Sequence, residues 1–350
     1  MDTLLNDFRS RCLEAILDLL WRQWCSLGVS GHAQPAKPEH LIDLEALVLV
    51  TTSIGRHEPR LFDEAFDWLA SYGALINLQR LTNLQSSHRL GDGPVLRSVA
   101  QWLAEKSTQP RWKAAAKIRP DSEIEPATAP LFFGLKGPTP TPPDDIFRSQ
   151  GLERSVFQPR GMSRAPQPLL PPNLMASLRS LIGVSARVEI ILYLAGSPSA
   201  AYATEIARAT GYAPRTLQTV LQEMLLSGHL LSWEPATQLK RKSGRNGHCR
   251  YHLQPTDWAF LTSGKPLPRW TPWAALFAIA RSVLAAIPAP GEKPRHHVVI
   301  SSQLRDTIAA QSPALAAAGL LPSLDLRPEA PSTELLQTLA ERLPTLLSSL

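Results

Sequence analysis

The sequence predicts a mainly α-helical fold with one small two-stranded β element, an α+β architecture overall. Apolar residues recur at three- and four-residue spacing through most of the chain, which is typical of amphipathic helices. Prolines gather in a single stretch, and a basic segment rich in turn residues follows one of the helices. A chain of 350 residues with 44% hydrophobic content is long enough to form two or three domains.

Composition divides the chain into four ranges. Residues 120–172 contain 12 of the 32 prolines, and because proline fixes φ and lacks a backbone donor we expect a linker there. Short ordered patches are expected near 131–135 and 146–157, where aromatic residues gather. Residues 171–265 hold 10 Lys and Arg against 5 Asp and Glu, whereas residues 1–170 hold 19 of each. The predicted ranges are a helical N-terminal domain at 1–119, the linker at 120–172, a basic domain at 173–265 and a C-terminal helical region at 266–350.

The N-terminal range predicts three helices. The first follows an apolar stripe over residues 4–24. Two more are expected over 41–54 and 60–72, and the second of these stops at Gly73 as a C-cap. The following segment, ALINLQRL, alternates well enough to predict a short strand.

The C-terminal range is also predicted to be mainly helical. A helix is expected over 270–287, an extended piece over 296–300 and a second helix over 302–310. A final helix is expected over 333–347, broken by Pro344.

Residues 185–226 carry the pattern that is most informative about function. A first helix is marked by the apolar residues of 188–194 and ends at Gly196. A short second helix over 203–209 ends at Gly211, and Pro214 occupies the first position of a third helix over 214–226.

The third helix has an apolar face and a polar face. The apolar face is predicted from Leu217, Val220, Leu221, Met224 and Leu225. The polar face is predicted from Arg215, Thr219 and Gln222, with Gln218 and Thr216 beside them. Arginine can form two hydrogen bonds to guanine and glutamine two to adenine, so this row suits the major groove of DNA. The acidic Glu223 flanks the row and would oppose phosphates, and a solvated helix face is the alternative interpretation of the helix alone.

A basic hairpin is predicted directly after this helix. Residues 230–234 are apolar enough for a strand, residues 250–253 can pair with it, and Asn246-Gly247 is a strong turn signal. The cations of the hairpin are Lys240, Arg241, Lys242, Arg245 and Arg250. Cations at such a hairpin can hold phosphates or enter a minor groove, and Asn246 is placed with them at the turn.

This order of elements resembles the winged helix-turn-helix of bacterial regulators of the MarR and ArsR families. The segment that carries the resemblance is ATEIARATGYAPRTLQTVLQEMLLSGHL, residues 203–230. The positions that match are Ile206, Ala207, Gly211, Leu217, Val220, Leu221, Leu225 and Gly228. The resemblance covers residues 185–253 and implies a DNA-binding domain there, not a particular operator.

The sequence therefore predicts a transcriptional regulator that binds double-stranded DNA with sequence specificity. Helix 214–226 would enter the major groove, and the basic hairpin over 232–253 would contact phosphates or the minor groove. One such module makes few contacts, so a homodimer on paired half-sites is expected. The rival hypothesis is a protein-interaction component, such as an antitoxin or adaptor, that uses the winged helix to bind a protein partner. Residues 41–84 similarly predict either a helical packing or dimerisation unit or a second, degenerate winged helix.

Other functional classes find little support in the sequence. No phosphate-binding glycine loop, H-E-x-x-H motif or G-x-S-x-G elbow is present, so we expect neither an enzyme nor a cofactor. The three cysteines are unrelated in spacing, and His296-His297 on a strand would point to opposite faces, so no metal site is expected. The longest apolar run, from Trp273, contains Arg281 and is shorter than a membrane span. These features together predict a cytoplasmic protein without a membrane partner.

Overall fold

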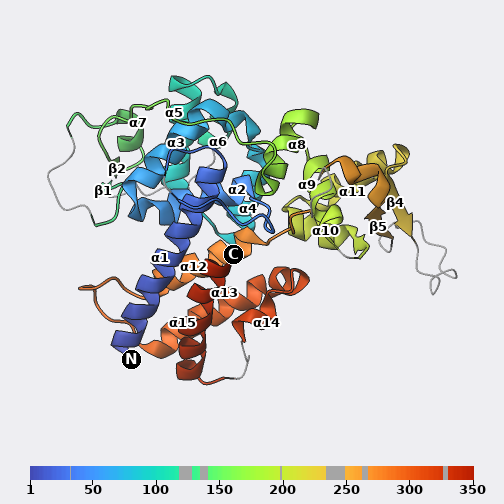
Figure 1. Ribbon diagram of the computed structural model, residues 1–350. Helices are drawn as coiled ribbons and strands as arrows, with labels where there is room; N and C mark the ends of the chain where they lie inside the picture. Colours follow the sequence, from blue (N-terminus) through green and yellow to red (C-terminus); the bar gives the residue numbers. More distant parts are fainter. Residues whose placement is uncertain are drawn as a thin grey trace. The chain divides into compact units, whose positions relative to one another are not determined.

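The computed structural model shows a mainly helical protein with small β-sheets (Figure 1). It describes residues 1–31, 33–117, 128–134, 141–197, 199–233, 249–261, 267–325 and 330–350. The chain forms two compact units. One contains residues 1–36, 44–167 and 273–350, and the other contains residues 37–43 and 168–272.

The first unit, here called the helical unit, is built from both ends of the chain. The 3₁₀ helices are labelled η. Its elements are α1 (Asp2–Ser26), α2 (Leu44–Ser53), η1 (Ile54–His57), α3 (Pro59–Tyr72), η2 (Gly73–Leu75), α4 (Leu78–His88), α5 (Gly93–Lys106), η3 (Pro110–Trp112), α6 (Lys113–Ala116), β1 (Ala129–Pro130), α7 (Asp145–Arg148), β2 (Leu152–Glu153), α12 (Trp273–Ala286), α13 (His297–Ala317), α14 (Leu321–Leu324) and α15 (Ser332–Ser349).

The N-terminal and C-terminal helices share one core, although the sequence places them in separate ranges. Helix α1 packs along α15 and also contacts α12 (Figure 1). Helix α12 is apolar on nearly every face because it is covered by α1, α2, α4 and α13. The Nε atom of Arg9 donates to the carbonyl of Ile287 at 3.1 Å, and His88 lies 2.8 Å from the amide oxygen of Gln311. The apolar faces of these helices are therefore buried by partners from the opposite end of the sequence.

Several sequence predictions in this unit are wrong in detail. The segment after Gly73 forms η2 and the helix α4, with Asn77 as its N-cap, and residues 41–84 contain no strand. A second winged helix therefore does not form there. The expected extended piece at 296–300 is the start of α13, with His296 as the N-cap. Helix α15 continues through Pro344, because the buried leucines around it hold the last turn in place.

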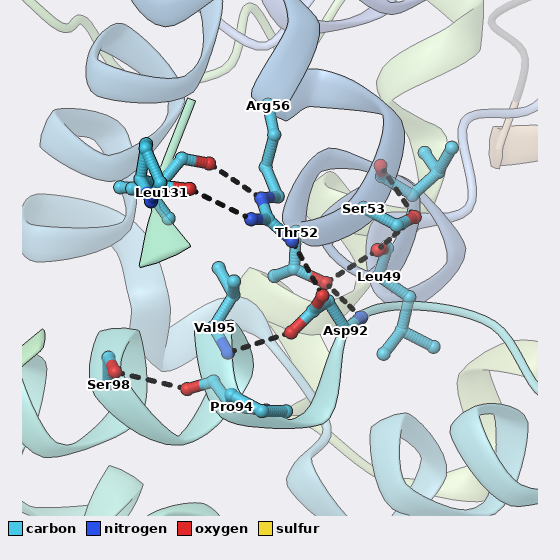
Figure 2. Close-up of polar contacts among 11 residues, drawn as sticks. Leu49, Thr52, Ser53, Arg56, Asp92, Pro94, Val95, Ser98 and Leu131 are labelled. Atoms are coloured by element: carbon cyan, nitrogen blue, oxygen red, sulfur yellow. Dashed lines mark hydrogen bonds and ion pairs between the residues drawn. The ribbon is translucent and has the colours of Figure 1, made fainter. Parts of the chain in front are cut away.

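Part of the proline-rich range is folded onto the helical unit. The side chain of Arg56 is central to this contact (Figure 2). Its Nε donates to the carbonyl of Leu131 at 2.6 Å and its Nη1 to the carboxylate of Asp92 at 2.7 Å. Asp92 in turn accepts from the amide of Val95 and so caps α5. One buried guanidinium thus joins η1, the start of α5 and the strand region near β1.

Acidic residues of α3 anchor a second part of that range. Asp63 pairs with Arg154 at 3.0 Å, and Glu64 pairs with Arg160. Asp67 accepts hydrogen bonds from the amides of residues 161 and 163. Phe157 stacks on Phe66 at 4.2 Å between ring centroids. The expected ordered patches near 131–135 and 146–157 are confirmed for their described residues, and they belong to the core rather than to a free tether.

The second unit, here called the mixed unit, holds the segment with most of the positive charge. Its elements are η4 (Pro171–Asn173), α8 (Leu174–Ile182), α9 (Ala186–Ala195), β3 (Ala201–Tyr202), α10 (Ala203–Thr210), α11 (Pro214–Leu226), β4 (Leu230–Trp233), β5 (Arg250–Leu253) and η6 (Pro255–Leu261). The three helices expected over 188–226 are confirmed, each within a few residues of its expected bounds.

A three-stranded antiparallel sheet completes this unit. The strand order is β3-β5-β4, so the last strand in sequence lies in the middle. Leu230 pairs with Leu253 and Trp233 with Arg250, while Tyr202 pairs with Arg250 from the other side. The pairing predicted between 230–234 and 250–253 is confirmed over these strands.

A short N-terminal segment also belongs to the mixed unit. The amide of Arg269 donates to the carbonyl of Glu39 at 2.7 Å, and the amide of Leu41 donates back to Arg269 at 3.1 Å. His40 lies 2.9 Å from the hydroxyl of Thr271, and burial lowers the pKa of His40. In neither unit does a described helix combine the length and hydropathy needed to cross a membrane.

Candidate nucleic-acid interface

Helix α11 begins from a tightly defined turn. Gly211 ends α10 with φ of +77°, a left-handed conformation that glycine adopts without the steric cost of a Cβ atom. The amides of Gly211 and Tyr212 both donate to the carbonyl of Ala207, at 2.9 and 3.2 Å. Pro214 then occupies the first turn of α11, where its missing N–H is not needed. The turn therefore fixes where α11 starts relative to α10.

The two faces of α11 are those predicted from the sequence. Leu217, Leu221 and Met224 are buried, and Val220 and Leu225 are half-buried. The exposed side chains are Arg215, Gln218, Thr219, Gln222, Glu223 and Leu226, and Thr216 is half-buried. The hydroxyl of Thr219 donates to the carbonyl of Arg215 at 3.2 Å. Arg215, Gln222 and Leu226 fall on one line along the exposed face, at spacings of seven and four residues.

The acidic residue on α11 is paired rather than free. The carboxylate of Glu223 accepts from Nη2 of Arg187, on α9, at 2.5 Å. Both side chains are about half exposed, at 50% and 48%. The pair leaves no net charge at this edge of the helix, so the repulsion that Glu223 would exert on an anion is largely offset.

A buried polar network holds the base of α11. Arg179 of α8 donates to Oε1 of Glu189, on α9, through Nε at 3.0 Å and through Nη2 at 2.6 Å. The hydroxyl of Tyr212 donates to Oε2 of the same carboxylate at 2.8 Å. The carboxylate and guanidinium are fully buried. Because Tyr212 lies in the turn before α11, this network ties the turn to two other helices.

The sheet presents one buried and one open face. Side chains alternate along each strand, so Ala201, Tyr251, Leu230 and Leu253 lie on the buried face. The open face carries Tyr202, Leu231, Trp233, Arg250 and His252. The guanidinium of Arg250 lies 4.7 Å from the centroid of the Tyr202 ring. The predicted hairpin residue Arg250 thus packs on the sheet, beside the first strand.

The other hairpin residues predicted from the sequence lie outside the described residues. These are Lys240, Arg241, Lys242, Arg245 and Asn246. Sequence reasoning missed β3, the pair Arg187–Glu223 and the network around Glu189. A strand of two residues gives no periodic signal, and pairs between helices depend on tertiary contacts that spacing does not show.

The described residues contain few other side chains that could bind a metal ion or act as a nucleophile. No cluster of three His, Cys, Asp or Glu there is close enough to hold a metal ion. The rings of His296 and His297 lie 4.3 Å apart at the start of α13, so the expected divergence on a strand is wrong. Burial raises the pKa of the Cys12 thiol to about 12, which keeps it protonated.

Comparison of the chain with family models, with curated proteins and with solved structures gave no match.

Proposed function

We propose that the mixed unit is a winged helix-turn-helix domain and that the protein is a transcriptional regulator that binds double-stranded DNA. The observation that carries the proposal is the element order α9-β3-α10-α11-β4-β5 with sheet order β3-β5-β4, joined to an exposed polar row on α11. In this arrangement α11 is the recognition helix, and β4 and β5 are the strands at the base of the wing.

The side chains of the exposed row have the chemistry for base edges. Arg215 and Gln222 lie seven residues apart on the exposed face, about 10 Å along the helix axis, so both can reach bases in one groove. Gln218, Thr216 and Thr219 flank them. The sugar-phosphate backbone would be held by the hairpin residues Lys240, Arg241, Lys242, Arg245, Asn246 and Arg250. A homodimer on two half-sites would supply the contacts that one module lacks.

Duplex selection followed by affinity measurement tests this proposal. The full chain would be used to select fragments from random duplex DNA, and binding of the best fragment would be followed by fluorescence anisotropy. Arg215→Ala should weaken specific binding about 5- to 150-fold and relax the base preference at one position, since a bidentate contact contributes ~1–3 kcal/mol. Arg148→Ala, which removes an exposed arginine from the helical unit, is the matched control and should change little.

Salt dependence separates the wing from the recognition helix. Replacing Lys240, Arg241, Lys242 and Arg245 together by alanine should make the slope of log affinity against log salt shallower by about 0.9 for each phosphate that the variant no longer neutralises. The base preference should remain. Glu223→Gln should leave binding equal or slightly tighter. If neither Arg215→Ala nor the fourfold variant altered duplex binding, the proposed interface would be wrong.

A second function is favoured by one observation on the same helix. Leu226 is 90% exposed and lies in line with Arg215 and Gln222, which suits an apolar contact with a protein partner. The protein would then be an antitoxin or adaptor that uses α11 to bind another protein. Copurification of a stoichiometric partner that Leu226→Asp abolishes, together with no retention on duplex DNA, would support this function instead.

A further inference from the structure

The open face of the β3-β5-β4 sheet carries a row of side chains that α11 does not use. Arg250, on the central strand, pairs directly with Tyr202 on one neighbouring strand and with Trp233 on the other. The three side chains therefore lie side by side on one face of the sheet. Arg250 is in the middle, with its guanidinium 4.7 Å from the centre of the Tyr202 ring. An aromatic residue therefore flanks the cation on either side.

Trp233 is unusually open for a tryptophan on a sheet. Its exposed fraction is 55%, and no ring contact or hydrogen bond of its indole is found among the described residues. Large aromatic side chains that remain exposed in a row mark interaction sites more often than isolated apolar residues do. Its ring face is therefore available to stack on a planar ligand.

The charges on this face select an anionic ligand. Arg250 has no carboxylate partner in the part of the chain that the structure describes, and its Nε is buried without a hydrogen-bond acceptor. The carboxylate of Asp257 pairs with His229 at 3.0 Å, and His229 precedes the end of β4 that lies away from Arg250. A ligand that offers a planar ring to Trp233 and an oxyanion to Arg250 matches both features. An unpaired nucleotide of a nucleic acid has this combination, because each base has a π face and each linkage a phosphate.

We propose that the open face of this sheet binds single-stranded nucleic acid, with a base stacked on Trp233 and the adjoining phosphate held by Arg250. Tyr202 is a positioning residue, since its ring fixes the guanidinium by a cation–π contact. This inference rests on the proposed function only in taking nucleic acid as the partner. It assigns a surface separate from the exposed row of α11, and only Arg250 is shared with the residues proposed to hold the duplex backbone.

The probe is a labelled oligothymidylate of about 12 nucleotides, a length within the range that one such face can cover. Its binding to the full chain would be measured by anisotropy and by quenching of tryptophan fluorescence. Trp233→Ala should weaken binding about 5- to 150-fold, the range expected for removal of one base–aromatic stack. Trp233→Phe should retain most of the affinity. Leu181→Ala, which removes an exposed apolar side chain from α8, is the control and should have no effect.

The role of Tyr202 has its own readout. Tyr202→Leu should make the salt slope shallower by about 0.7, the value for one phosphate on a single strand, whereas Tyr202→Phe should preserve it. A purely structural role would change stability but not this slope.

The design separates this surface from the one on α11. Trp233→Ala should spare the affinity for the selected duplex, and Arg215→Ala should spare the affinity for oligothymidylate. If the wild type bound oligothymidylate but no duplex, the proposed function would be refuted and this inference would stand. Failure of the wild type to bind oligothymidylate, or equal binding by Trp233→Ala, would refute the inference. A change of oligomeric state in Trp233→Ala without oligonucleotide binding would instead assign the face to an interface between copies of the chain.

Discussion

Removing the carboxylate of Glu189 should destabilise the mixed unit strongly. Glu189 is fully buried and accepts three hydrogen bonds, two from Arg179 and one from the hydroxyl of Tyr212. Glu189→Ala leaves the guanidinium buried without its counterion, and breaking a buried ion pair from one side costs about 3–5 kcal/mol. The change also removes the hydrogen bond from the hydroxyl of Tyr212, in the turn before α11, so the start of α11 should be held less firmly.

The measurement is the free energy of unfolding in urea at neutral pH. Because the two units could unfold separately, hydrogen exchange of peptides from 168–272 would assign the destabilisation to the mixed unit. Tyr212→Phe should cost less, about 1.5–3 kcal/mol for one hydrogen bond to a charged group. Glu223→Ala is the matched control, because it removes the glutamate of an exposed Arg–Glu pair in the same unit and should cost at most about 1 kcal/mol. A destabilisation below about 1 kcal/mol for Glu189→Ala would refute the reasoning.

Two further predictions concern the helical unit. Gly28 has φ of +101°, and a Cβ atom there would lie 2.2 Å from the carbonyl oxygen of Arg164, so Gly28→Ala should lower the free energy of unfolding by about 2 kcal/mol or more. Gly161→Ala is the control, because a Cβ atom there has no heavy atom within 4 Å and meets only the backbone penalty at φ of +64°. If urea unfolding showed an equal destabilisation of the two variants, the steric argument would be contradicted. Burial, followed by the charges of Arg9 and Arg56, lowers the pKa of His57 to about 4. Since the unfolded chain binds this proton near pH 6.5 and the folded chain does not, stability should fall as the pH drops from about 6.5 to 4, by about 1 kcal/mol after solvent screening. His57→Gln should remove that part of the pH dependence in urea titrations, and an unchanged dependence would show that another group causes it.

The elements of the mixed unit were largely predictable because their signals are local. The spacing of Leu217, Leu221 and Met224 specifies which face of α11 is buried, and Gly211 and Pro214 specify its limits. The strand pairing also follows from apolar runs that flank a turn signal. The structure bears out these elements, and their role in binding remains a proposal.

The helical unit was less predictable because its stability depends on distant contacts. The stripe on α1 shows that one face is buried but does not show that α15 covers it. The composition of the proline-rich range predicts a linker. In the structure Arg56 and Asp67 form hydrogen bonds with its backbone, and Asp63 pairs with one of its arginines. Similarly, the alternating ALINLQRL and the HHVVI segment are helical because packing in the unit overrides a short local preference.

The pairing of α1 with α15 has a consequence for synthesis of the protein. These helices are separated by about 300 residues, which a ribosome translates in roughly 15–60 s at 5–20 residues per second. During that time the apolar stripe of α1 has no α15 to cover it, whereas every element of the mixed unit from α8 onward emerges close to its partners. The mixed unit can therefore fold before the helical unit closes, and α1 keeps an apolar face uncovered in the meantime.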